Sequence, residues 1–301
     1  MTKKINILIT GGSGMIGRHL THLLSKHYAV SWVGRSKKNI PDVHQYIWNP
    51  KSGTIDPEAI ANADYIIHLA GENLADHRWT DSYKKKIIDS RIESTSLLQK
   101  KLNEIPNNVK AVICASAIGI YKDEGAAWQK EDSITLADDF LGSVVKKWEE
   151  ANSHFSCRTV ICRFGIVLSE KGGAFPQLFL PLRFGVAPIF GNGKHYQSWI
   201  HIDDLSELLK FSIENDKVHG LYNAVAPAPV TFYDFMNTLQ KVIKWPSVKI
   251  PFPAFLLKLF LGEKSVIVLE GSRVSSEKIQ SEGFDFLYKD LSSAFSNLLK
   301  K

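Results

Sequence analysis

The feature that most constrains this chain is a glycine-rich segment near its beginning. Residues 5–10 form a short apolar run, and Gly11, Gly14 and Gly17 follow it where a turn and a helix would begin. A side chain at Gly11 or Gly14 would hold the backbone away from a pyrophosphate, while Gly17 lets the helix pack closely on the strand. Free N–H groups at the helix start would then bind the phosphates. This order of strand, glycine turn and helix predicts a dinucleotide-binding loop rather than a simple tight turn. The residues expected at the cofactor are Thr10, Gly11, Gly12, Ser13, Gly14, Met15, Ile16 and Gly17.

The end of the second predicted strand distinguishes the two nicotinamide dinucleotides. An NAD site usually carries Asp or Glu about 20 residues after the loop. This chain has Arg35 and Ser36 in that region and no acid before Asp42. Because a guanidinium binds phosphate oxygens in a fixed fork, Arg35 and Ser36 suit the 2′-phosphate of NADP(H). NADP(H) is therefore the predicted cofactor, and a solvated basic turn is the alternative interpretation.

Beyond this loop, the first two-thirds of the chain alternates β-branched runs with amphipathic helical stretches. That alternation is typical of a parallel sheet covered by helices on both faces. We therefore expect an α/β fold, a Rossmann-type doubly wound parallel sheet with a smaller C-terminal lobe on the substrate side. Small residues at one strand exit would let a cofactor approach the backbone, which adds Leu69, Ala70 and Gly71 to the expected site. The predicted strands are residues 5–10, 29–33, 65–69, 111–115 and 159–163.

The character of the chain changes after about residue 170, where glycines and prolines follow one another closely. Such a pattern is typical of loops and short elements. We assign residues 1–170 to an NADP(H)-binding Rossmann domain, to which some later segments return, and residues 171–301 to a smaller substrate-side region. Within that region, helices are expected at residues 203–214, 232–243 and 253–261, and a strand at 221–225.

Composition and cysteine content bound the class of protein. Hydrophobic residues make up 44% and charged residues 23% of the chain, as in an ordinary globular protein with a large core. Cys114, Cys157 and Cys162 lie in apolar surroundings, which predicts buried free thiols in a reducing compartment and neither a disulfide nor a metal site. No export signal is recognised at the N-terminus, and the apolar segment 252–261 is too short to span a bilayer. A cytoplasmic protein without a membrane partner is therefore expected.

The net charge of +6 is spread along the chain, apart from three consecutive lysines at residues 84–86. A run this short is more typical of a solvated helix face than of a nucleic-acid patch. The expected partner is therefore a small molecule rather than a nucleic acid, and the oligomeric state is left open.

Taken together, these motifs resemble those of the extended short-chain dehydrogenase/reductases, whose members include nucleotide-sugar epimerases and dehydratases. The matching segments are residues 10–17, 68–71, 116–121, 163–165 and 199–205. More narrowly, the chain is similar to an atypical epimerase-like group that has a C-terminal domain of unknown function. The markers of that group are residues 48–50, 69–72, 90–95, 148–149, 253–263, 271–274 and 283–286.

The resemblance also implies a catalytic pair that this chain lacks. Ordinary members use a tyrosine four residues before a lysine on one helix face to move a proton during hydride transfer. None of the nine tyrosines here has a lysine four positions later. On the expected helix, residues 137–151, the equivalent positions hold Leu141 and Val145, or Gly142 and Lys146 after a shift of one residue. That face is predicted to pack through an apolar stripe, which consists of Leu136, Phe140, Leu141, Val144, Val145 and Trp148.

A few polar residues remain as weaker candidates. Ser116 and Tyr121 lie near the positions of the family's catalytic serine and a conserved marker, so each is a possible proton donor with a structural role favoured. Glu72 and Arg91 are candidates for the substrate pocket: Arg91 would bind an anionic substrate or a cofactor phosphate, or else form an ordinary surface salt bridge. Asp203 or Asp204 is expected to cap a helix rather than to act as a base.

The sequence therefore predicts an NADP(H)-binding protein that is epimerase-like or oxidoreductase-like, with an unidentified substrate and without the standard catalytic pair. The competing interpretation is a non-catalytic NADP(H)-binding sensor or partner-binding module. The residues indicate the cofactor, whereas the epimerase-like activity rests on the resemblance.

Overall fold

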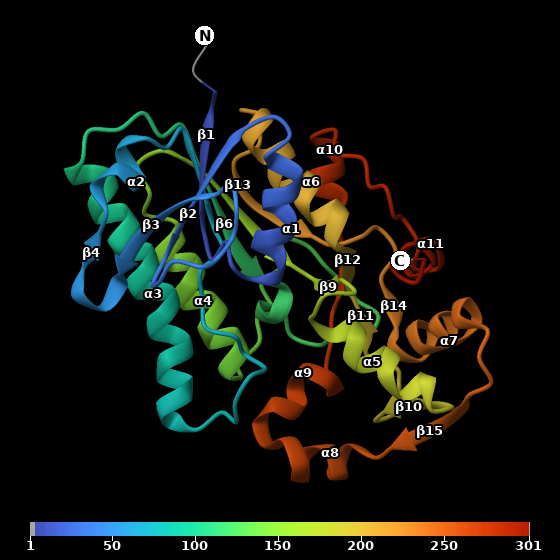
Figure 1. Cartoon of the computed structure of the whole chain (residues 1–301). Helices are drawn as coiled ribbons and strands as arrows, with labels where there is room; N and C mark the ends of the chain where they lie inside the picture. Colours follow the sequence, from blue (N-terminus) through green and yellow to red (C-terminus); the bar gives the residue numbers. More distant parts are fainter. Residues whose placement is uncertain (1–3, 301) are drawn as a thin grey trace.

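The glycine loop lies at the centre of a twisted sheet in the computed structural model, which describes residues 4–300 (Figure 1). In this part of the chain the sheet has eight strands in the order β13-β8-β6-β5-β1-β2-β3-β4. Every pairing is parallel except β3 with β4. The strands are β1 (Asn6–Thr10), β2 (Ala29–Gly34), β3 (His44–Asn49), β4 (Thr54–Ile55), β5 (Tyr65–His68), β6 (Ala111–Ala117), β8 (Arg158–Phe164) and β13 (Gly220–Ala224).

The strand order reverses at β1, because the chain first builds the sheet outward through β2 to β4 and then returns to the other side of β1 with β5. Connections that diverge from two neighbouring parallel strands leave a crevice at their carboxyl ends, and ligands of such sheets bind there. The crevice between β1 and β5 is therefore where the topology places a ligand.

Helices cover both faces of the sheet (Figure 1). Ile7 and Ile9 of β1 pack with α1 (Met15–Leu24) and α6 (Ile202–Glu214) on one face. Leu8 points the other way and packs in the core that includes α2 (Pro57–Ala61) and α3 (Asp81–Glu104), beside which lies α4 (Phe140–Asn152). Successive residues of a strand point to opposite faces, so an apolar strand such as β1 is buried on both sides.

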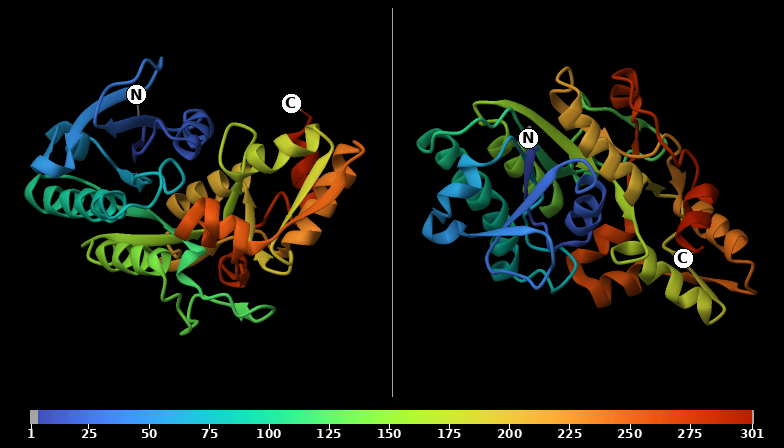
Figure 2. Two further views of the ribbon diagram at one scale, coloured as in Figure 1. Left: turned by 90° about the horizontal axis from the view of Figure 1, so that it is seen from below. Right: turned by 45° about the horizontal axis from the view of Figure 1, so that its top comes forward.

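A smaller lobe with its own core lies beside the sheet (Figure 2). Its aromatic core includes Phe175, Trp199, Phe235 and Phe295. The helices in this half of the chain are α5 (Ala174–Arg183), α7 (Phe232–Ile243), α8 (Ala254–Leu261), α9 (Val266–Leu269), α10 (Glu277–Ser281) and α11 (Leu291–Leu298). The short strands outside the main sheet are β7 (Trp128–Gln129), β9 (Ile166–Leu168), β10 (Val186–Phe190), β11 (Tyr196–Gln197), β12 (Trp199–His201), β14 (Val230–Thr231), β15 (Val248–Phe252) and β16 (Arg273–Val274).

The predicted Rossmann-type α/β class is confirmed, and each predicted strand is present within two residues of its expected bounds. Strand β3 was not predicted, because it is only half-buried: Tyr46 and Trp48 are buried, while the intervening Ile47 and the flanking polar residues are not. Two later segments, β13 and α6, lie with the sheet, whereas α5 and α7 contribute to the core of the lobe.

The structure also bears on the cysteines and on membrane segments. Within residues 4–300 the three thiols are free, and Cys114 and Cys162 are buried. Cys157 is only half-buried, so the prediction of burial is wrong for this residue, which lies between α4 and β8 at the edge of the core. Across the described chain, no helix combines the length and apolar character needed to cross a bilayer.

Candidate functional site

The glycine loop is held so close to its neighbours that side chains are excluded. Gly11 has a φ of +71°, and a Cβ atom there would lie 2.9 Å from the carbonyl carbon and oxygen of Leu69. A Cβ at Gly17 would lie 2.6 Å from the Gly11 oxygen, so the first turn of α1 packs directly on the loop. Gly14 is the N-cap of α1 and, within residues 4–300, receives no side-chain cap. The N–H groups at this helix start are therefore available to an anion.

Thr10 ties the glycine loop to the exit of β5. Its hydroxyl oxygen accepts the N–H groups of Leu69 and Ala70, each at 3.1 Å, and lies 2.7 Å from Nδ1 of His68. Because the oxygen already accepts two bonds, we assign the hydroxyl proton to the bond with Nδ1, which leaves Nε2 to donate to Thr95 at 3.1 Å. Complete burial lowers the pKa of His68 to about 3, so the ring is neutral. This network fixes the backbone of residues 69–71 beside the loop.

Both backbone segments line one cleft of about 780 Å³ at the carboxyl ends of β1, β2 and β5. Of the residues predicted at the cofactor, those that line it are Gly11, Gly12, Ser13, Gly14, Arg35, Ser36, Leu69, Ala70 and Gly71. Thr10 is buried beneath the loop, and Met15, Ile16 and Gly17 belong to the first turn of α1. The cleft thus brings together the glycine loop and the basic end of β2.

Basic side chains gather along this cleft. The Arg35 side chain is 77% exposed, and its Nη1 lies 4.0 Å from the Glu72 carboxylate. Lys86 donates to the same carboxylate at 2.8 Å, and this hydrogen bond lowers the pKa of Glu72. The lysines at residues 84–86 are therefore not simply a solvated helix face: Lys85 and Lys86 line the cleft, and Lys84 pairs with Glu263. An exposed guanidinium, a serine and lysines at one wall fit a ligand that carries phosphate groups.

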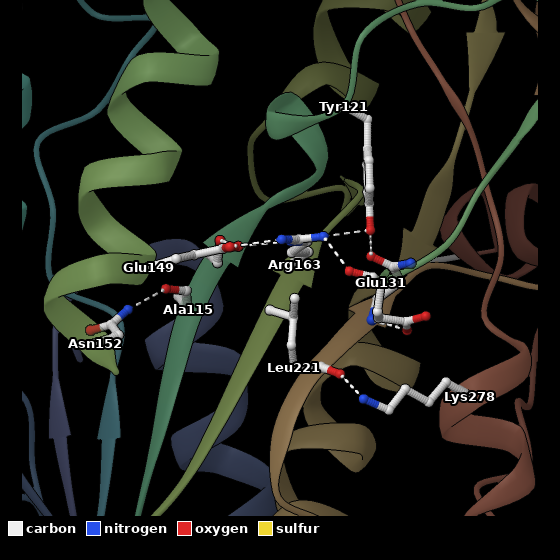
Figure 3. A network of polar contacts seen from close by, with 10 residues as sticks. Ala115, Tyr121, Glu131, Glu149, Asn152, Arg163, Leu221 and Lys278 are labelled. Carbon is white, nitrogen blue, oxygen red and sulfur yellow. Dashed lines mark hydrogen bonds and ion pairs between the residues drawn. The ribbon is translucent and has the colours of Figure 1, made fainter. Parts of the chain in front are cut away.

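The two weak catalytic candidates are both engaged inside the protein, and Figure 3 shows Tyr121, Arg163 and Glu149 of the network that holds them. Ser116, at the end of β6, donates to Glu149 at 2.5 Å. Tyr121 donates to Asn223 at 2.8 Å and accepts from Arg163 at 2.7 Å, and burial raises its pKa to about 12. Arg163 completes the network with two 2.8 Å bonds to Glu149. The sequence analysis did not identify the Arg163–Glu149 pair as a partner of either hydroxyl. The only sign of it in the sequence is that both residues fall within family-matching segments, 148–149 and 163–165.

A second pocket of about 300 Å³ lies beside α4, the helix on which the family resemblance predicts the position of the catalytic pair. Leu141 and Val145, on α4, both line it. The helix begins at Phe140 with Asp139 as its N-cap, whose carboxylate accepts the Gly142 N–H at 2.8 Å. Leu136 therefore lies outside the helix and is 36% exposed, so it was wrongly included in the apolar stripe. The remaining residues of the stripe lie on α4, and most of them also border this pocket.

Arg91 and Glu72 lie in different places. Glu72 lines the large cleft, while Arg91 lines the second pocket. Arg91 is buried, and its Nη1 donates to the backbone oxygens of Ile87 and Glu72 at 3.0 and 3.1 Å. Its guanidinium lies 4.8 Å from the ring centroid of Trp148. The alternative of a surface salt bridge is wrong, because the side chain is buried and no carboxylate among residues 4–300 lies within 4.0 Å of it.

The predicted aspartate cap of α6 is also wrong. His201 is the N-cap, and its Nδ1 accepts the Asp203 N–H at 3.1 Å. Asp203 pairs with His19 at 2.7 Å. Asp204 accepts the N–H groups of Leu287 and Tyr288, and burial raises its pKa to about 6. Aspartate is a commoner N-cap residue than histidine, so the two acids that follow His201 make the true cap hard to predict from the sequence.

The fold and the cleft define a Rossmann-type protein of the short-chain dehydrogenase/reductase class. The model of the NAD dependent epimerase/dehydratase family matches residues 7–140, and that of a domain of unknown function (DUF1731) matches residues 252–298. Epimerase family protein YfhF of Bacillus subtilis is 34% identical over 98% of both chains. The human epimerase family protein SDR39U1 is 31% identical over 98% of this chain and 100% of its own. The chain therefore belongs to this epimerase family, as the resemblance predicted.

Solved structures agree with this assignment. The crystal structure of human SDR39U1 (isoform 2) with NADPH matches with a TM-score of 0.89 and 31% identity, covering 99% of this chain and 100% of that one. A UDP-glucuronic acid 4-epimerase from Bacillus cereus matches with a TM-score of 0.79 at 17% identity, covering 98% of this chain and 99% of that one, which shows a shared fold alone.

Proposed function

We propose that this chain binds NADP(H) in the large cleft and acts as an epimerase-like oxidoreductase on a small molecule held in the second pocket. The observation that carries the proposal is that one cleft joins the uncapped start of α1 and the glycine loop to Arg35 and Ser36. The NADPH in the human SDR39U1 structure supports the same cofactor for this chain.

Each part of the cleft has a role in this proposal. The N–H groups of residues 11–14 hold the pyrophosphate, because they lie at a helix start that no side chain of the described residues caps. Arg35 and Ser36 hold the 2′-phosphate, and Leu69, Ala70 and Gly71 allow the close approach of the sugar and nicotinamide. When bound, the nicotinamide supplies hydride transfer. Trp32, which fills the space behind Gly12, keeps the loop in its place.

The proton donor cannot follow the family's usual pattern. No tyrosine of this chain stands four residues before a lysine, and the hydroxyls of Ser116 and Tyr121 are bonded to Glu149, Asn223 and Arg163. Those contacts favour a second candidate function, a non-catalytic NADP(H)-dependent sensor. The adjoining pocket, which a protein that only binds the cofactor does not need, favours the enzyme.

The test is a cofactor titration with two matched charge reversals. Arg35→Asp is expected to weaken NADPH binding about ten- to hundredfold while leaving NADH binding nearly unchanged, because it removes a charged fork from the 2′-phosphate. Lys37→Asp makes the same kind of change two residues away, at an exposed side chain outside the cleft lining, and should leave both affinities almost unaltered.

Equal loss of NADPH affinity in both variants would show that general surface charge, not Arg35, decides the preference. The same proteins are then mixed with NADPH and a panel of carbonyl compounds and nucleotide sugars, and the absorbance of the reduced nicotinamide is followed. Substrate-dependent oxidation supports the enzyme. Tight binding without turnover across the panel supports the sensor.

A further inference from the structure

The second pocket has the chemical character of a site for a small, largely apolar ligand. It lies among α3, α4, the turn after β6 and the segment 266–272 of the C-terminal region. Its apolar walls include Leu74, Ile118, Val144 and Val266. A volume of about 300 Å³ is at the lower end of the range for ligand sites in proteins.

Two residues that line this pocket each carry a buried N–H donor for which residues 4–300 provide no acceptor. Arg91 is 7% exposed and Trp148 is 6% exposed, and both residues line the pocket. Within residues 4–300, neither Nε of Arg91 nor Nε1 of Trp148 has a hydrogen-bond acceptor. Buried donors in folded proteins are almost always satisfied, because leaving one unpaired costs free energy. An acceptor group on a ligand would satisfy both donors.

Arg91 also contributes a buried charge. Burial lowers the pKa of its guanidinium to about 10, so it remains a cation at neutral pH. It bonds only backbone oxygens through Nη1 and lies over the Trp148 ring, and the described residues bring no carboxylate within ion-pair distance. An unpaired buried charge is unfavourable, and a bound anion would compensate it.

The remaining charges of the pocket limit how much negative charge a ligand can carry. The carboxylates of Asp123, Asp139 and Glu270 line it, and Arg91 is the one cation among its described lining residues. Burial, together with Asp139 and Asp123, raises the pKa of Glu270. Arg91 can balance one negative charge, so a diphosphate would leave its second charge unbalanced beside three acidic residues. The pocket therefore suits a single negative charge at the Arg91 end.

We infer that this pocket binds a small organic monocarboxylate with an apolar body, whose carboxylate accepts hydrogen bonds from Nε of Arg91 and Nε1 of Trp148. The inference rests on the proposed function, since it names the substrate class of that site. The predicted substrate differs from the nucleotide sugars that the family name suggests, because a nucleotide sugar would bring two phosphates to a pocket with one cation.

The test measures binding of hexanoate, hexanamide and UDP-glucose to the full chain by calorimetry, with NADPH present at saturation and without it. Hexanoate is expected to bind, and hexanamide about tenfold or more weakly, because only the carboxylate pairs with Arg91. Trp148→Phe keeps an aromatic ring under the guanidinium and removes the N–H, and is expected to weaken hexanoate about tenfold. Trp245→Phe is the matched control, at a partly exposed tryptophan outside the pocket lining, and should leave hexanoate affinity unchanged.

Arg91→Met removes the charge at similar length and is expected to abolish hexanoate binding while leaving NADPH affinity within about threefold. If this variant does not fold, Trp148→Phe carries the test alone. The inference is overturned by equal binding of hexanoate and hexanamide, by preferential binding of UDP-glucose, or by a parallel tenfold loss of NADPH affinity in Arg91→Met, which would assign Arg91 to the cofactor. Failure of the proposed function is a separate result, namely that the unaltered protein does not bind NADPH.

Discussion

The large cleft and the neighbouring sheet edge use polar groups in opposite ways. In the cleft, the groups proposed to bind the cofactor are backbone N–H donors of one short segment and an exposed Arg35. At the ends of β6 and β8, the hydroxyls of Ser116 and Tyr121 are already bonded within the buried network around Arg163. The first arrangement is open to a ligand, whereas the second holds the protein together. The groups proposed to bind the cofactor and the groups of the buried network are therefore separate sets of residues in this fold.

The largest effect that would test this contrast is the loss of the buried ion pair. Arg163→Met leaves the Glu149 carboxylate and the Tyr121 hydroxyl without their partner, and the expected loss in the free energy of unfolding is about 3–5 kcal/mol. Denaturant unfolding measures it. Arg183→Met, at an exposed arginine of α5, should change stability by less than about 0.5 kcal/mol. A stable Arg163→Met protein that has lost activity would mean that the network is catalytic.

A smaller loss of stability, with a larger loss of binding, is expected in the glycine loop. In Gly17→Ala the new Cβ would lie 2.6 Å from both the Gly11 oxygen and the Gly12 Cα, so the loop must move. We expect about 2 kcal/mol of destabilisation from overpacking, and NADPH affinity reduced by more than about tenfold. In Gly119→Ala, beside the second pocket, the nearest atom is 3.7 Å away, and both quantities should stay close to those of the unaltered chain. Unchanged NADPH binding in Gly17→Ala would contradict the proposed role of the loop.

A third expected effect is a pH dependence that arises beneath the cleft and develops gradually over several pH units. His68 titrates near its ordinary value of 6.5 in the unfolded chain, but its folded-state pKa is about 3. Between these values the unfolded state binds more protons, so the free energy of unfolding falls as pH falls from about 6.5, by at most about 1.4 kcal/mol per pH unit. Unfolding measured from pH 7 to 4 should show a shallower slope in His68→Gln than in His22→Gln, which alters an exposed histidine. Identical slopes would show that His68 is not buried as a neutral ring.

Much of the fold could be predicted from the sequence where the signals are local. The helix at residues 232–243 has the bounds expected from its apolar spacing. The bounds of α4 were less accurate, because Asp139 caps it three residues into the expected range. Strand β3 was missed because its pairing with β2, rather than its own composition, makes it a strand. The His201 cap of α6 was missed for a related reason. Which polar side chain accepts the N–H group at the helix start depends on the partners of the neighbouring polar side chains, and those partners are distant in sequence.

The candidate site divides in the same way. That residues 11–14, 35–36 and 69–71 line one cleft could be predicted from the sequence, because each segment lies at a strand exit and parallel strands bring their exits to one edge. The roles of Ser116 and Tyr121 could not be settled from the sequence, since their partners Glu149, Asn223 and Arg163 lie far along the chain.

The sequence by itself determined the glycine loop, the basic end of β2 and the absence of a tyrosine four residues before a lysine, because each is a property of neighbouring residues in one segment. Only the tertiary structure decided that Arg163 and Glu149 take up the two remaining hydroxyls and that Arg91 and Trp148 border a second pocket with unpaired donors. Hydrogen bonds and burial depend on which segments, distant in the sequence, come into contact. Packing around the sheet, rather than residue order, determines those contacts.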